Sequence, residues 1–176
     1  MAQQLLIIVL SVLVLLVMGA TLLFFYFRAL QHELDLDWQI VLDNLRLRLD
    51  KIPNLLETVR AFAPGEAKKI DDLAKLRGNN WPLEDPGKEK ASGELSISMN
   101  LKAVWSLSKK YPELARDTNF LALKTEFKEI ILEIEKSVEF YNKRVGRYNG
   151  IVRFILFLPF SLLMRFPKMP LFAFSN

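Results

Sequence analysis

The sequence contains no cysteine and a single histidine, His32, and both scarcities narrow the chemistry open to it. Without cysteine there is no disulfide framework, thiolate nucleophile, zinc–thiolate site or lipoprotein anchor. A zinc or haem site would have to be built from this one histidine and carboxylates alone, so we expect no metal and no cofactor. The net charge is only +4 and acidic and basic residues are interleaved, so we also expect no nucleic-acid partner.

One long apolar run is present, from Leu5 to Phe27. About 23 helical residues span about 34 Å, enough to cross a hydrocarbon core of about 30 Å. Tyr26 and Arg28 lie where aromatic and basic residues meet lipid headgroups. The alternative, a cleaved signal peptide, lacks a basic residue in its first positions, and the run is too long for it. We therefore expect residues 1–30 to be a single-pass transmembrane anchor, with the bilayer as a partner.

The distribution of basic residues near this run predicts an orientation. Residues 1–4 contain no Lys or Arg, whereas Arg28, Arg46, Arg48 and Lys51 follow the run. Basic residues near a membrane segment favour the cytoplasmic side. The sequence therefore predicts an N-terminus outside and a folded domain in the cytoplasm.

After the run, apolar residues repeat at alternating steps of four and three, which places them on one face of a helix. They are Trp38, Leu42, Leu45, Leu49, Ile52, Leu56, Val59 and Ala63. Pro53 falls inside this stripe and predicts a bend, while Pro64-Gly65 predicts the end of the helix. No Gly or Pro lies between Gly19 and Pro53, so the membrane helix can continue into this one.

Three further helices are expected, at residues 66–77, 94–110 and 118–154, with Asp117 or Thr118 capping the last. The segment Gly78–Gly93 is rich in Gly, Pro, Asn and charge, and predicts a long loop. Trp81 within it either docks on the helices or contacts a partner. Amphipathic helices bury their apolar faces together, so we expect an all-α, antiparallel bundle of about four helices at residues 31–153.

Three segments resemble signature motifs of the LemA family: WQIVLDNLRLRLDKIPNLLETVRAFA from Trp38, YPELARDTNFL from Tyr111 and YNKRVGRYN from Tyr141. The matching residues are Trp38, Gln39, Arg46, Arg48, Asp50, Ile52, Pro53, Asn54, Leu55, Glu57, Thr58, Val59, Tyr111, Pro112, Leu114, Asn119, Phe120, Leu121, Tyr141, Asn142, Val145, Tyr148 and Asn149. The resemblance implies a bacterial inner-membrane protein with an antiparallel helical bundle, and it implies no particular chemistry.

The sequence departs from the family pattern at several positions. Val41-Leu42 and Leu47 differ from the usual residues of the first motif. In the tail, Ile155-Leu156 replaces a Phe-Pro pair, and Arg165-Phe166 replaces a Gly-Phe pair.

Four polar residues of these motifs are the best candidates for a site: Asn54, Glu57, Asn142 and Asn149. Pro53 leaves the carbonyl of Leu49 without its helical donor, which a side-chain amide could replace. One interpretation is a buried polar network that fixes helix register. The other is a ligand pocket at the bend.

Acidic residues are numerous, but they do not form a metal-binding pattern. Those considered are Asp50, Glu57, Glu126, Glu129, Glu133 and Glu135. The bundle sites that bind two irons need Glu-x-x-His pairs, and lysines alternate with the acidic residues of the last helix. We therefore expect an ion-paired face, no catalytic, cofactor-binding or metal-binding residue, no small-molecule substrate and no enzymatic activity.

The tail, residues 154–176, is rich in Phe and Leu and contains Arg165 and Lys168. Its uninterrupted apolar part, about 11 residues, is too short to span a bilayer. It either rests among lipid headgroups or covers the open end of the bundle. Two functions follow: a non-enzymatic scaffold that binds membrane or envelope proteins, or a peripheral lipid-surface protein acting through the tail.

Overall fold

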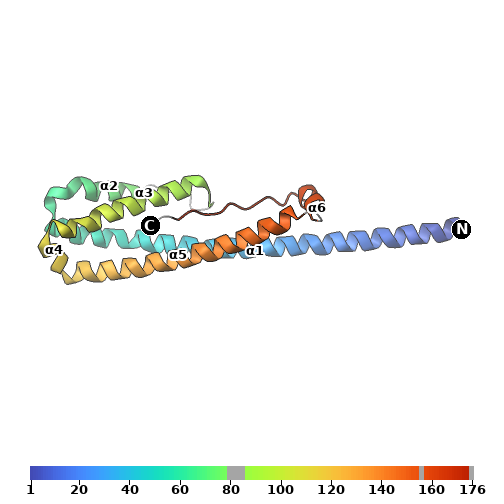
Figure 1. Ribbon diagram of the computed structural model, residues 1–176, viewed down its shortest axis with the longest axis horizontal. Helices are drawn as coiled ribbons and strands as arrows, with labels where there is room; N and C mark the ends of the chain where they lie inside the picture. The colour runs from blue at the N-terminus through green and yellow to red at the C-terminus, as the bar shows by residue number, and fades with distance from the viewer. Residues whose placement is uncertain (79–85, 155–156, 175–176) are drawn as a thin grey trace. The chain divides into compact units, whose positions relative to one another are not determined.

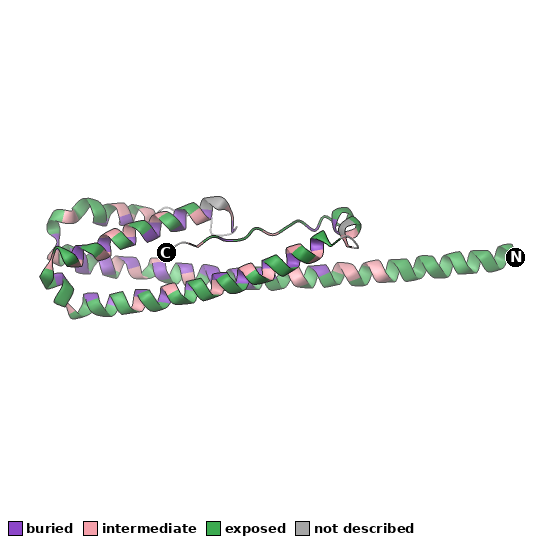
Figure 2. Cartoon of the chain, in the orientation of Figure 1, coloured by how far each residue is buried: buried purple, intermediate pink, exposed green. Residues whose placement is uncertain are grey.

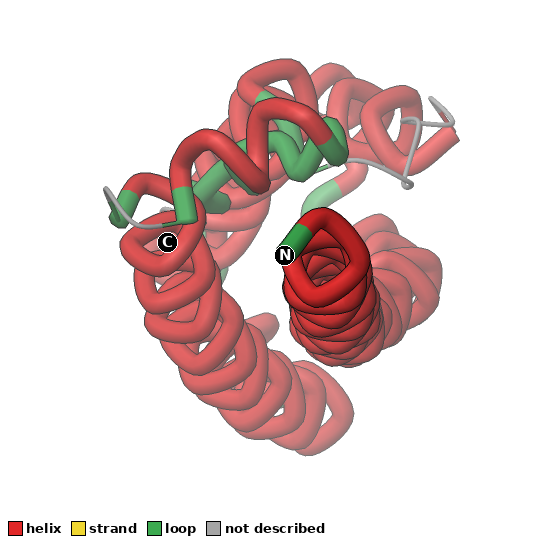
Figure 3. Tube along the Cα trace, turned by 90° about the vertical axis from the view of Figure 1, so that its right-hand side faces the viewer, coloured by secondary structure: helices red, strands yellow, loops and turns green. Residues whose placement is uncertain are grey.

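The computed structural model describes residues 1–78, 86–154 and 157–174, and this part of the chain is helical with no strand (Figures 1 and 3). The elements are α1 (Ala2–Phe62), η1 (Pro64–Glu66), α2 (Ala67–Gly78), α3 (Lys88–Trp105), η2 (Ser106–Lys109), α4 (Pro112–Arg116), α5 (Thr118–Arg153) and α6 (Leu158–Leu163). The all-α prediction is confirmed.

Helix α1 is continuous from the apolar run into the domain, and it passes through Pro53 without ending (Figure 1). The proline leaves the carbonyl of Leu49 without its usual backbone donor. The Nε of Arg77, on α2, donates to that carbonyl at 3.1 Å. A guanidinium, not the side-chain amide expected from the sequence, therefore replaces the missing hydrogen bond.

The chain forms two compact units, which we call the anchor unit (residues 1–36 and 144–169) and the bundle unit (residues 37–143 and 170–176). Within the bundle unit, residue pairs along α1 and α5 run in opposite directions: Asn119 contacts Thr58, Glu126 contacts Lys51 and Ser137 contacts Asn44. Helix α2 is likewise antiparallel to α1, because Asp71 pairs with Arg60 and Arg77 with Leu49. These contacts define an antiparallel helical bundle.

The apolar stripe predicted for α1 contributes Ile52, Leu56, Val59 and Ala63 to the core of the bundle unit. The buried cluster contains Ile52, Leu55, Leu56, Val59, Ala63, Ile70, Leu73, Ile97, Leu101, Val104, Leu107, Leu114, Phe120, Leu123 and Phe127. Trp105 packs against this cluster, with its ring centroid 5.3 Å from those of both Phe120 and Phe127. Asp117 caps α5 by accepting from the backbone N–H of Phe120 at 2.7 Å, as expected for one of the two candidate caps.

Helix α3 begins at Lys88, six residues before the predicted start, inside the segment expected to be a loop. The difference has a physical cause. Lys90 and Glu94 are buried in the bundle unit, so the first turns of α3 carry charged residues at positions where an apolar stripe would be expected. Residues 79–85 of the predicted loop, including Trp81, lie outside the described residues.

The anchor unit contains the apolar run and an aromatic cluster. Phe27 is fully buried and stacks on Phe166 with centroids 5.0 Å apart, while Phe157 and Phe160 lie within about 6 Å of the same ring. By contrast, the large apolar side chains from Leu5 to Val17 are all exposed (Figure 2). Helix α1 is long and apolar enough to cross a membrane, and none of its most apolar stretch is buried.

Candidate functional site

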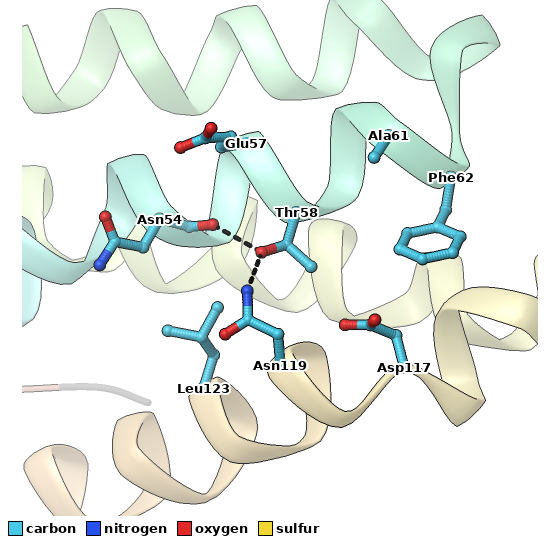
Figure 4. Close-up of a pocket in the computed structure, with 8 residues that line it drawn as sticks. All are labelled: Asn54, Glu57, Thr58, Ala61, Phe62, Asp117, Asn119 and Leu123. Atoms are coloured by element: carbon cyan, nitrogen blue, oxygen red, sulfur yellow. Dashed lines mark hydrogen bonds between the residues drawn. The ribbon is translucent and has the colours of Figure 1, made fainter.

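Two of the four candidate polar residues meet in a groove between the end of α1 and the start of α5, which we call the α1–α5 groove (Figure 4). Its volume is about 420 Å³. The lining residues are Asn54, Glu57, Thr58, Ala61, Phe62, Asp117, Asn119 and Leu123. The groove thus joins residues of the first LemA-like motif to Asn119 of the second.

Local hydrogen bonds fix part of this groove. The hydroxyl of Thr58 donates to the carbonyl of Asn54 at 2.9 Å, and the amide of Asn119 donates to the same hydroxyl oxygen at 2.9 Å (Figure 4). Asn54 and Glu57 remain exposed to solvent. The lining combines the amides of Asn54 and Asn119, the carboxylates of Glu57 and Asp117 and the hydroxyl of Thr58.

The other two candidates do not connect helices to one another. In the bundle unit, the side chain of Asn142 donates to the carbonyl of Phe172 at 2.8 Å and accepts from the N–H of Phe172 at 2.9 Å. The hydroxyl of Tyr141 donates to the carbonyl of Pro170 at 3.1 Å. Phe172 is buried, with its ring 5.1 Å from that of Trp38. Asn142 therefore holds the main chain of the tail rather than setting helix register.

Asn149 makes the same arrangement within the anchor unit. Its amide donates to the carbonyl of Met169 at 2.9 Å, and its oxygen accepts from the N–H of Met169 at 2.9 Å. A side-chain amide presents one donor and one acceptor, which matches the N–H and C=O of a single extended residue. The sequence contained no signal for these pairs, because the tail partners follow no periodic pattern.

Sequence reasoning also missed a buried cluster of charges in the bundle unit. Arg48 and Glu94 form an ion pair with less than 2% exposure on either side chain, and Arg48 also donates to the hydroxyl of Ser98 at 3.3 Å. Burial raises the pKa of Glu94 against the opposing effect of Arg48. Removal of one partner from such a buried ion pair leaves the other charge unpaired, and this strongly destabilises the fold.

Lys90 lies beside this pair and is 3% exposed. Its Nζ is 5.6 Å from the ring centroid of Trp38 and has no hydrogen-bond partner among the described residues. Burial lowers the pKa of Lys90 to about 8, although Glu94 acts in the opposite direction. The first turns of α3 therefore contact the rest of the bundle unit through the Arg48–Glu94 ion pair and the Lys90–Trp38 cation–π contact. Apolar side chains are usual at such buried positions.

Two of the six acidic residues considered for a metal site take part in ion pairs. Glu126 pairs with Lys51, and Glu133 with Lys136 at 2.6 Å. The described residues contain no group of three or more acidic, His or Cys side chains that could hold a metal ion.

Comparison with known proteins agrees with the motifs that line the groove and hold the tail. No curated protein matches the chain. The model of the LemA family matches residues 37–176, which is most of the sequence and includes the whole bundle unit. The chain therefore belongs to the LemA family.

Proposed function

We propose that this protein is a membrane-anchored, non-enzymatic interaction module that binds other membrane or envelope proteins. The observation that carries the proposal is the exposure of α1: its most apolar stretch is 0% buried, which distinguishes it from the core helix of a soluble protein. A helix of this kind is stable in lipid, and it tethers the bundle at the membrane surface.

The α1–α5 groove supports the part of the proposal that concerns binding of other proteins. It presents the exposed side chains of Asn54, Glu57 and Asn119, which are not needed to fill the core. Exposed polar groups at the rim of a concave surface are suited to hydrogen bonds with a protein partner. We infer that the partner contributes donors, including a cation for Glu57.

The test is purification of the full-length protein from its native membrane, after an alkaline carbonate wash. We expect the chain to resist the wash and to carry a partner in fixed stoichiometry. Glu57→Lys should remove that partner, because it reverses the charge in the groove. Glu129→Lys, an exposed substitution on α5 outside the groove, is the control. A chain released by carbonate would refute the anchor, and equal loss in both variants would refute the groove.

A second function, contact with the lipid surface, is favoured by the exposed side chains of α6. Leu162 and Leu163 are 70% and 76% exposed, whereas Ser161 of the same helix is buried. Because the chain lacks cysteine, Leu163→Cys allows a single fluorescent label at this site. In liposomes we expect quenching by spin-labelled lipid, with Leu121→Cys on α5 of the bundle unit as the control. Equal quenching at both positions would argue against lipid contact by α6.

A further inference from the structure

A second groove lies wholly within the anchor unit, and we call it the juxtamembrane groove. It is lined by Tyr26, Leu30, Glu33, Leu34, Arg144, Arg147, Tyr148 and Ile151, and its volume is about 310 Å³. One wall comes from α1 at the end of the apolar run, and the other from the last turns of α5. The groove is mixed in character, with aliphatic side chains beside two guanidinium groups.

The charge of this region is strongly one-sided. No Asp or Glu follows Glu139 anywhere in the sequence. The bases of the anchor unit are Arg28, Arg144, Arg147, Arg153, Arg165 and Lys168, against the acids Glu33 and Asp35. Such an excess attracts an anionic surface and suits phosphate groups.

Within the groove the two arginines differ. Arg144 donates to Glu33 at 3.2 Å, so its charge is partly compensated. Arg147 is exposed and has no ion pair among the residues that the structure describes. Between them, two arginines and one glutamate leave the groove with a net positive charge, and Arg147 is the cation available to a ligand.

Tyr148 adds a second polar group. Its side chain is 2% exposed, and its oxygen accepts from the amide of Gln31 at 3.0 Å. Since the oxygen is the acceptor in this bond, the hydroxyl proton remains available for donation. A phosphate oxygen in the groove would therefore meet both a guanidinium and a hydroxyl donor.

The position of the juxtamembrane groove along α1 indicates which kind of phosphate-bearing molecule it binds. If residues 5–27 cross the bilayer, as the proposed function requires, Tyr26 and Leu30 lie at headgroup depth. We propose that the juxtamembrane groove binds the phosphodiester of an anionic phospholipid, with Arg147 and Tyr148 as donors to the phosphate. The exposed apolar surface of α1 beside the groove accommodates the acyl chains.

The proposal is tested on the full-length protein in a neutral detergent by native mass spectrometry. The probes are dihexanoyl-phosphatidylglycerol, dihexanoyl-phosphatidylcholine and glycerol 3-phosphate. We expect retention of the phosphatidylglycerol above the other two. Arg147→Gln should weaken it on the order of tenfold, since one charge-assisted contact is lost. Arg147→Lys should retain part of the binding.

Lys102→Gln, which removes one exposed charge from α3 of the bundle unit, is the matched control and should leave retention unchanged. Equal loss in Lys102→Gln and Arg147→Gln would overturn the site in favour of general charge attraction. Equal retention of glycerol 3-phosphate would overturn the lipid assignment, and equal retention of phosphatidylcholine would overturn the preference for anionic lipid.

The failure of this inference is distinguishable from failure of the proposed function. The short-chain lipids are soluble, so their binding is measured whether or not the chain resists carbonate extraction. Retained binding with a carbonate-soluble chain would refute only the anchor.

Discussion

Arg165 occupies a backbone conformation that usually belongs to glycine. Its φ is 55°, and among the described residues it is the non-glycine position where φ is positive. Two hydrogen bonds end α6 around it: Phe166 N–H donates to Ser161 O at 2.8 Å, and Arg165 N–H to Leu162 O at 3.3 Å. This is the Schellman arrangement, whose left-handed residue is most often glycine. The Gly-Phe pair usual in the family matches it, and Arg165-Phe166 replaces that pair here.

We therefore predict that Arg165→Gly stabilises the end of α6. Glycine adopts positive φ without a clash of Cβ, and relief of that strain is worth about 1 kcal/mol, less the added freedom of the unfolded chain. The exchange of the Phe166 amide proton should slow several-fold, as measured by hydrogen exchange in detergent. Lys168→Gly, in the extended tail, is the control and should give no protection. Faster exchange at Phe166 would contradict the prediction.

The buried amine of Lys90 predicts a specific pH dependence. Its pKa in the folded protein is about 8, below the ordinary value of 10.5. Between these two pH values the unfolded chain holds a proton that the folded chain has lost, so stability rises as the pH increases from about 8 to about 10.5. Below pH 8, burial of the charge opposes folding.

Lys90→Met keeps an unbranched side chain, one heavy atom shorter, and removes the charge. We expect it to stabilise the bundle unit at pH 7 by roughly 1–3 kcal/mol, reduced by the lost contact with Trp38. The rise in the thermal unfolding midpoint between pH 8 and 10.5 should also flatten. Lys102→Met, exposed on the same helix, should do neither. A lower midpoint for Lys90→Met at pH 7 would show that the amine is stabilising where it lies.

At the scale of elements, periodicity decided what the sequence could predict. The stripe of α1 repeats at helical spacing, and Trp38, Leu42 and Leu45 are buried as expected. Helix α3 was placed six residues late because its first turns bury Lys90 and Glu94. The partner of Glu94 is Arg48, 46 residues away, and no local pattern links the two.

The tail shows the same limit. The tail is held by hydrogen bonds between its main-chain groups and side-chain amides. Because nearly every residue has the same main-chain groups, the sequence does not indicate which of them will form these bonds. Phe166 and Phe172 pack inside their own units, whereas Leu162, Leu163 and Leu171 are exposed. Lipid contact by the exposed residues remains a prediction.

Asn142→Leu tests the role of the amide in holding the tail. The substitution removes both bonds to Phe172, at a cost of about 1–3 kcal/mol, while keeping a side chain that branches at Cγ. We expect the Phe172 amide to exchange at least tenfold faster, with the helical content unchanged. Asn100→Leu is the control, because the amide of Asn100 donates to the carbonyl of Ser96 in its own helix and not to the tail residues that the structure describes. Unchanged exchange at Phe172 would show that its burial alone holds the tail.

At the scale of the whole molecule, the prediction still to be tested is the orientation of the chain in the membrane. Residues 1–4 carry no basic group, whereas Arg28 follows the apolar run directly and the bundle unit adds Arg46 and Lys51. Basic residues are retained on the cytoplasmic side during insertion, so the bundle should face the cytoplasm. Since the chain has no cysteine, Gln3→Cys and Lys102→Cys each introduce a single thiol. A membrane-impermeant maleimide applied to intact cells should label the first, and the second only after permeabilisation. The cysteine-free chain sets the background, and labelling in the reverse order would place the bundle unit outside.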